Sequence, residues 1–234
     1  MKTARPLLLC AMFAFLFAAP DTNAAPLFPT SYDMLNGSGE RNDGKYNYWD
    51  SSYSGKGSTG EDNASLSVGL GDLTDGVIAD SNWYRAENPE GTGPYVGWRA
   101  SVNKNPLVTF RFAASTLLDS VTIFVDDSNG EGGVSTPESV DIGIEGGKYT
   151  NFITVDPKGA APTSYTFSNL ALTGSAFDVR FNNANDWIFL SEVQFDGRAA
   201  AVPEPATYLL SAVGLIALGL VARCRRVTEP SNRP

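Results

Sequence analysis

The sequence predicts an all-β fold, an antiparallel β-sandwich, for residues 26–198. Apolar and polar residues alternate in several short runs of this segment, which is the pattern of half-buried strands. Clusters of Gly, Pro, Asp and Asn, such as Asp126–Gly133 and Asp156–Pro162, separate these runs as turns do. Helical periodicity is nearly absent, so we do not expect crossover helices or a parallel sheet.

Five runs carry the strand pattern most clearly. They are residues 108–112, 121–125, 140–144, 177–181 and 187–195. In the first run, Val108, Phe110 and Phe112 share one face because successive side chains of a strand point to opposite sides. The N-terminal third of the domain is rich in Gly, Ser, Asn and Tyr, and we expect little regular structure there.

The composition excludes several kinds of chemistry. The chain has no histidine, which removes the usual zinc ligand, the Ser-His-Asp and Cys-His arrangements, and the commonest general base at neutral pH. Its two cysteines, Cys10 and Cys224, lie in or beside the apolar ends, so no disulfide can join parts of the domain. The formal charge is −9, and an acidic domain repels nucleic-acid phosphates. We therefore expect no nucleic-acid partner.

The N-terminal end has the three parts of a secretory signal peptide. Lys2 and Arg5 precede the apolar run Leu7–Ala19, and small residues follow near Ala24. The apolar run is shorter than the ~20 residues that a membrane span needs. The sequence therefore predicts that signal peptidase removes residues 1–25.

The C-terminal end, residues 199–234, combines a proline motif, an apolar segment and a basic stop. The uncharged segment 207–222 would extend about 24 Å as a helix, slightly short of a ~30 Å hydrocarbon core. We expect one transmembrane helix there, with the C-terminus in the cytoplasm and the domain outside. The motif residues are Val202, Pro203, Glu204 and Pro205, and the stop residues are Arg223, Arg225 and Arg226.

The order of these three parts resembles the tail of PEP-CTERM proteins over about 25 residues. The resemblance implies that an exosortase-type membrane protease recognises the Pro-Glu-Pro motif and removes the helix, and that the inner membrane holds the protein before processing. It also implies a Gram-negative-type bacterium that makes exopolysaccharide. The processed protein would then lie at the cell surface or in the extracellular matrix.

Within residues 66–197, the order of four motifs resembles the galactose-binding-like jelly roll of discoidin domains and related carbohydrate-binding modules. The motifs are Gly71–Gly76, Tyr95–Trp98, the runs at 108–112 and 120–125, and Phe189–Phe195. The resemblance implies a structural calcium ion between Asp75 and Glu192, with Asp72 nearby. The alternative is that Asp75 only makes a turn hydrogen bond before Gly76.

A second acidic loop has a spacing close to that of an EF-hand calcium loop. Its positions are Asp127, Asn129, Glu131, Gly132 and Glu138. Both flanks have strand patterns instead of helical ones, and Pro137 stands directly before the last carboxylate. A polar hairpin turn is therefore the preferred interpretation of this spacing.

Aromatic residues in loops, together with nearby arginines, are the candidates for ligand contact. Sugar rings present C–H faces that stack on aromatic rings, and arginine supplies oriented hydrogen bonds. For each single aromatic, packing in the interior is the alternative. The candidates are Trp49, Trp83, Tyr84, Arg85, Tyr95, Trp98 and Arg99.

These observations predict an exported, non-catalytic surface or matrix protein that binds exopolysaccharide. One alternative is a structural or adhesion protein whose domain assembles with protein partners. Another is a glycan hydrolase or lyase, since paired carboxylates can cleave glycosides without histidine. Candidate acids such as Asp126 and Glu131 are plentiful, but no spacing singles out an acid and its partner.

Overall fold

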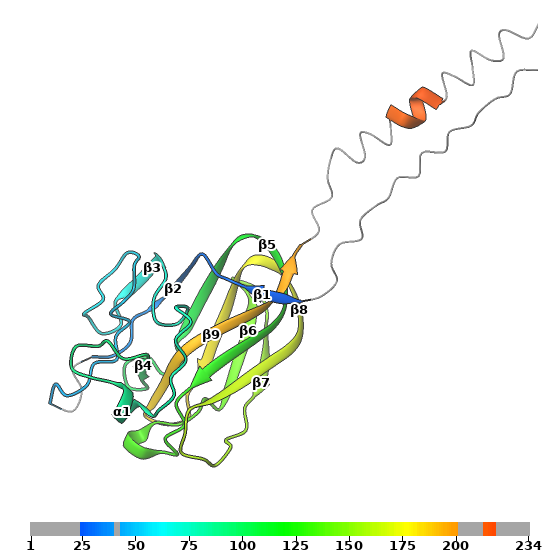
Figure 1. Ribbon diagram of the computed structural model, residues 1–234. Helices are drawn as coiled ribbons and strands as arrows, with labels where there is room; N and C mark the ends of the chain where they lie inside the picture. The colour runs from blue at the N-terminus through cyan, green and yellow to red at the C-terminus, as the bar shows by residue number, and fades with distance from the viewer. Residues whose placement is uncertain (1–23, 40–42, 201–212, 219–234) are drawn as a thin grey trace, which may run out of the picture.

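The computed structural model describes residues 24–39, 43–200 and 213–218. Nine strands account for nearly all regular structure of the domain, which confirms the predicted all-β fold (Figure 1). The strands are β1 (Ala25–Leu27), β2 (Ser31–Leu35), β3 (Ser65–Gly69), β4 (Val96–Arg99), β5 (Leu107–Val125), β6 (Ser139–Ile144), β7 (Tyr149–Ile153), β8 (Thr163–Asn182) and β9 (Trp187–Ala199). The domain also contains the short helix α1 (Trp83–Ala86) and the 3₁₀ turn η1 (Glu131–Gly133).

All pairs of named strands are antiparallel, and the main path of neighbours runs β1-β9-β5-β8-β6-β7. The long strands β5 and β8 pair with each other along most of their length, with register shifts that let them bend. The first part of β5 pairs with β2, and its second part pairs with β9. One hydrogen-bonded path therefore continues through both layers of the sandwich.

The runs at 108–112 and 121–125, expected as two strands, are two halves of the single strand β5. Its register with β8 shifts between Arg111 and Thr116, and the residues between them are mostly exposed. The polar and small residues of this stretch are of the kinds found in turns. The strand nevertheless continues, because the residues before and after the stretch pair with neighbouring strands.

Aromatic side chains from both layers fill the main core. Phe110 and Phe195 are buried with ring centroids 4.8 Å apart, and Phe112 packs against both Phe177 and Phe195. Burial of one such side chain contributes about 1.5–3 kcal/mol to stability. Without disulfides in the domain, this apolar burial and the sheet hydrogen bonds hold the sandwich together.

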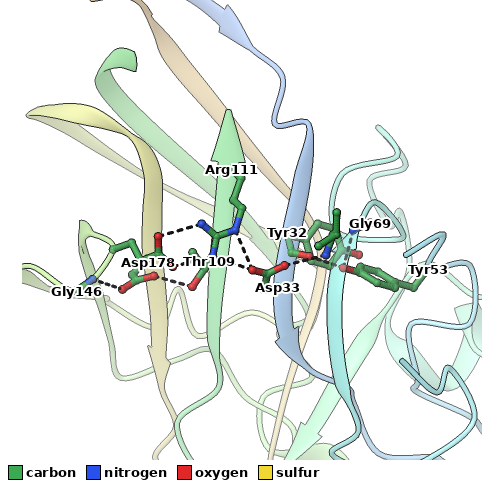
Figure 2. Close-up of polar contacts among 10 residues, drawn as sticks. Tyr32, Asp33, Tyr53, Gly69, Thr109, Arg111, Gly146 and Asp178 are labelled. Carbon is green, nitrogen blue, oxygen red and sulfur yellow. Dashed lines mark hydrogen bonds and ion pairs between the residues drawn. The ribbon is translucent and has the colours of Figure 1, made fainter. Parts of the chain in front are cut away.

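The N-terminal third is mostly loop, as expected, and side-chain hydrogen bonds order it. Buried Asp50 accepts a hydrogen bond from the Tyr32 hydroxyl, and the Tyr53 hydroxyl donates to the Tyr32 carbonyl. The Gly69 N–H donates to the same Tyr53 hydroxyl at 2.9 Å (Figure 2). These bonds attach the loops to β2 and β3.

On the outer face, charged and polar side chains connect neighbouring strands. Arg111 of β5 lies 2.8 Å from the carboxylate of Asp33 on β2 and also forms a two-bond pair with Glu145 (Figure 2). Thr109 of β5 donates to Asp178 of β8 at 2.7 Å. Ion pairs and hydrogen bonds between side chains thus connect neighbouring strands on the polar face of the sheet.

Several predictions concern segments outside the described residues. The signal peptide lies outside them except at positions 24 and 25, and so do the motif Val202–Pro205 and the basic stop Arg223–Arg226. Residues 213–218, inside the predicted span 207–222, are helical. In the described ranges, no helix has both the length and the apolar character needed to cross a bilayer.

Candidate functional site

One end of the sandwich gathers α1, η1 and the beginning of β9 (Figure 1). We call this the loop end. Strand β1 and the C-terminal end of β9 lie at the opposite end of the domain (Figure 1). Because β1 pairs with residues 195–197, both ends of the domain sequence leave from that opposite end.

A cavity of about 410 Å³ opens at the loop end, and we call it the aromatic pocket. Its lining comes from several segments that are distant in the sequence. The lining residues are Tyr48, Trp83, Arg99, Gly132, Val134, Trp187 and Phe189. Most of them belong to a second apolar cluster, separate from the main core.

The rings of the aromatic pocket support one another. Trp187 and Phe189 of β9 stack with centroids 5.6 Å apart, and Tyr48 meets them at 5.3 and 4.6 Å. Trp83 stands edge-on to Tyr48 at 6.1 Å. Such offset and edge-to-face contacts are favourable ring geometries, so they hold the wall in a fixed shape.

Asp126 positions Trp83. Its buried carboxylate accepts the backbone N–H of Trp83 at 3.0 Å and the side-chain amide of Asn82 at 2.9 Å. The Ser128 hydroxyl donates to the same carboxylate at 2.9 Å. The first N–H groups of a helix have no partner within the helix, so Asp126 serves α1 as a cap from another segment. Burial raises the pKa of Asp126, and the three donors oppose that shift.

The loop between β5 and β6, to which Asp126 belongs, also approaches the Trp83 indole at Gly132. Gly132 has a φ of 65°, and a Cβ there would lie 2.6 Å from Cζ2 of the Trp83 indole. Both the backbone conformation and the close approach therefore require glycine at this position. The same approach buries the Trp83 Nε1–H, which has no hydrogen-bond partner among the described residues.

Arg99 supplies the charge of the aromatic pocket. It ends β4, where its register partner on β9 is Trp187, and its guanidinium lies 5.9 Å from the centre of that indole ring. The side chain is exposed to solvent. The pairing of β4 with β9 thus places a cation beside the aromatic wall.

The structure places the predicted ligand residues in four different settings. Trp83 and Arg99 line the aromatic pocket, and Tyr84 and Arg85 follow Trp83 on α1. Tyr95 and Trp98 are buried and donate to the carbonyls of Ser81 and Leu35, so they pack in the interior. Trp49 packs on Gly39 and donates its indole N–H to Asp62, outside the pocket.

Trp187 and Phe189 are not among the site residues predicted from the sequence, because their run has the pattern of a buried strand. Tyr48 is one of the loop aromatics flanked by polar residues, but it is not one of the selected ligand candidates. No local pattern marks these three residues, since they converge only when the loop that carries Tyr48 packs against the N-terminal end of β9. Sequence periodicity predicts which residues of a strand are buried. It does not predict whether the end of that strand lines a pocket.

The predicted calcium residues are only partly together. Asp75 and Glu192 line one cavity of about 460 Å³. The Gly76 N–H donates to Glu192 at 3.2 Å, and the Val77 N–H donates to Asp75 at 2.8 Å in a local turn. Asp72 accepts a hydrogen bond from Ser52 instead.

Burial raises the pKa of both Asp72 and Glu192 to about 7. For Asp72 the neighbouring charge of Asp50 adds to the effect, and for Glu192 that of Asp75 does so. A calcium ion would favour the charged carboxylates over the protonated ones. In the described segments, however, no three His, Cys, Asp or Glu side chains converge as metal ligands. Calcium between Asp75 and Glu192 would thus depend largely on backbone carbonyls, and it stays a prediction.

The second acidic loop connects the strands β5 and β6, in agreement with the strand patterns of its flanks. Asp127 accepts the N–H of Asn129 at 3.1 Å in a local turn, Glu131 begins η1, and the Glu138 N–H donates to the Asn182 carbonyl at 2.9 Å. Gly132 and Val134 of the same loop line the aromatic pocket.

Two family models match the chain. The model for the discoidin domain-containing receptor 1/2, DS-like domain, matches residues 29–197, and the model for the PEP-CTERM protein-sorting motif matches residues 201–226. Both resemblances expected from the sequence are confirmed by these matches. A comparison with curated proteins gives no match.

Three of the solved structures that are similar to this chain are the following. The F5/8 type C domain of a Bacteroides fragilis protein is 12% identical with a TM-score of 0.43, over 76% of this chain and 99% of that one. The lectin domain of lectinolysin, complexed with Lewis B antigen, is 15% identical with a TM-score of 0.38, over 55% and 83%. A Streptococcus pneumoniae fucose binding module is 10% identical with a TM-score of 0.36, over 53% and 80%.

Proposed function

The chain belongs to the DS-like domain family of the discoidin domain-containing receptors, and from this we propose that it is an exported, non-catalytic protein that binds exopolysaccharide at the aromatic pocket. The observation that carries the proposal is the pocket itself, in which Tyr48, Trp83 and Trp187 stand beside the guanidinium of Arg99. Its described wall is mostly aromatic, and the guanidinium of Arg99 can orient a ligand.

The chemistry of this wall suits a sugar. The C–H faces of a pyranose pack on indole and phenol rings, and the hydroxyl groups around its edge need directed partners. The rings are held by mutual contacts and by the Asp126 cap, so little ordering is needed when a ligand binds. A cavity of about 410 Å³ has room for one or two sugar units.

The position of the pocket suits a protein attached at its C-terminus. The PEP-CTERM motif at residues 201–226 indicates export and sorting to the cell surface. We infer that signal peptidase and an exosortase-type protease process the chain at the inner membrane of a Gram-negative-type bacterium. The loop end, where α1 contributes Trp83 to the pocket, lies opposite the C-terminal end of β9 (Figure 1).

The contacts of Asp126 favour binding over hydrolysis. A glycosidase needs two carboxyl groups on opposite sides of the scissile bond, one of them available as acid or nucleophile. Asp126 is buried and accepts hydrogen bonds from Asn82, Trp83 and Ser128, which is a structural arrangement. The described residues that line the aromatic pocket include no carboxylate.

The test is a glycan array with the purified full chain, followed by titration against the best polysaccharide. Trp83→Ala should weaken binding by about tenfold or more, because it removes a ring at the centre of the contact. Phe28→Ala is the matched aromatic control, since Phe28 is 83% exposed and lies outside the pocket. Absence of saturable sugar binding by the native chain would favour the structural or adhesion role, and release of reducing ends would favour the hydrolase.

A further inference from the structure

The arginines of the domain fall into two groups by partner. Elsewhere in the described chain, arginines pair with carboxylates. These pairs are Arg111 with Asp33 and Glu145, Arg180 with Asp141, and Arg198 with Asp119. Arg85 and Arg99 have no carboxylate partner within the described residues, and their guanidinium groups lie over the rings of Tyr84 and Trp187 at 5.7 and 5.9 Å.

This difference is unexpected for an acidic protein. With 26 Asp or Glu residues against 17 Lys or Arg, a surface arginine has many carboxylates to choose from. Nevertheless, among the described residues that line the aromatic pocket, Arg99 is the only charged one. Arg99 therefore brings to the pocket a positive charge that has no carboxylate partner among the described residues, and such a charge can attract an anion.

We propose that the aromatic pocket takes an anionic sugar residue, such as the uronate unit of an acidic polysaccharide, with its charged group on Arg99. The inference rests on the proposed glycan-binding function and specifies the class of glycan. The planar guanidinium can give two parallel hydrogen bonds to a carboxylate, and it stays charged at any physiological pH. The rings beside it receive the apolar face of the same sugar unit.

Arg99 also has the mechanical support that such a contact needs. Its backbone is fixed by the pairing of β4 with β9, and its side chain rests on an indole ring, which limits its conformations. Its side chain already lies over the aromatic wall without a carboxylate to displace. Binding an anion therefore does not require an internal ion pair to be broken.

The test uses three polymers with the purified full chain. They are polygalacturonate, the same polymer after chemical reduction of its carboxyl groups, and dextran sulfate. Binding to polygalacturonate should exceed binding to the reduced polymer, and Arg99→Gln should weaken it by about tenfold or more, because a hydrogen bond to a charged group is lost. Preference for dextran sulfate with the same Arg99 dependence would support the anionic site and identify a sulfate ester as its ligand.

Arg198→Gln is the matched control, since it removes the same charge from the last residues of β9, outside the aromatic pocket, where Arg198 pairs with Asp119. Equal weakening by both substitutions would show a general charge effect and overturn the proposal. Equal binding of the native chain to the reduced and unreduced polymers would also overturn it, while leaving glycan binding intact. Failure to bind any charged or neutral glycan would contradict the proposed function as well. The affinity of Arg99→Lys for polygalacturonate should lie between those of the native chain and Arg99→Gln. Lysine keeps the positive charge but cannot give the two parallel hydrogen bonds of a guanidinium.

Discussion

Glu87 should make the stability of the domain depend on pH. It follows α1, and its carboxyl group is buried. One oxygen accepts the N–H of Tyr95 at 2.8 Å, and the other is buried without a partner among the described residues. Burial raises the pKa of Glu87 to about 8, and the bond from Tyr95 reduces that rise.

The sign follows from where the proton is held. In the unfolded chain a glutamate titrates near ~4.3, so between about pH 4.5 and 8 the folded state keeps a proton that the unfolded state has lost. The free energy of unfolding therefore falls as pH rises through this window. Each pKa unit is worth about 1.4 kcal/mol, so the rise to about 8 sets a ceiling of about 5 kcal/mol for this one group.

Glu87→Gln isolates this contribution. Glutamine keeps the oxygen that accepts from Tyr95 and stays neutral at every pH. Between pH 5 and pH 8.5, the free energy of unfolding in urea should fall by about 2–4 kcal/mol less in the variant than in the native chain. Buried acids that do not interact with Glu87, such as Glu192, titrate equally in both proteins and cancel in the comparison. Glu90→Gln, an exposed change in the following loop, is the control. Identical pH slopes for native chain and Glu87→Gln would refute the reasoning.

Three further outcomes are expected. Gly97→Ala should destabilise the domain by about 1–3 kcal/mol in urea unfolding, because its Cβ would overlap the ring of Phe189, whereas Gly159→Ala, in open space, should change little. Arg111→Gln should cost only about 1 kcal/mol or less, and the loss should shrink at high salt, since its ion pairs are half exposed. If calcium binds beside Asp75, the melting temperature should fall when a chelator is added, and Asp75→Asn should abolish that response; an unchanged midpoint in the native chain would exclude the metal.

The fold was largely predictable because its signals are local. Alternation in the runs at 140–144 and 177–181 identified parts of β6 and β8, and 187–195 covers most of β9. The stretch between Arg111 and Thr116 misled the prediction, because a bulge in a long strand and a turn between two strands use similar residues. The small strands β2 and β3 were not expected, since β2 depends on pairing with β5, β3 depends on pairing with β2, and neither has a strong pattern of its own.

The candidate site was predictable only in part. Trp83 and Arg99 stood out because an aromatic or a cation in a polar, glycine-rich loop is unusual, and both line the aromatic pocket. The same criterion also selected Trp98, whose ring is buried in the main core. Loop residues near strand ends have similar local sequences whether they point inward or outward, so local sequence could not separate these cases.

By itself, the sequence determined the class of fold, the absence of histidine and disulfide chemistry in the domain, and the sorting motif that follows it. These depend on composition and on spacing within a few residues, which the chain carries in any conformation. Only the tertiary structure decided that Tyr48, Trp83, Arg99 and Trp187 form one wall, and that Arg99 has no carboxylate partner among the described residues. Strand pairing and loop closure bring together residues up to about 140 positions apart, and no local pattern encodes such contacts.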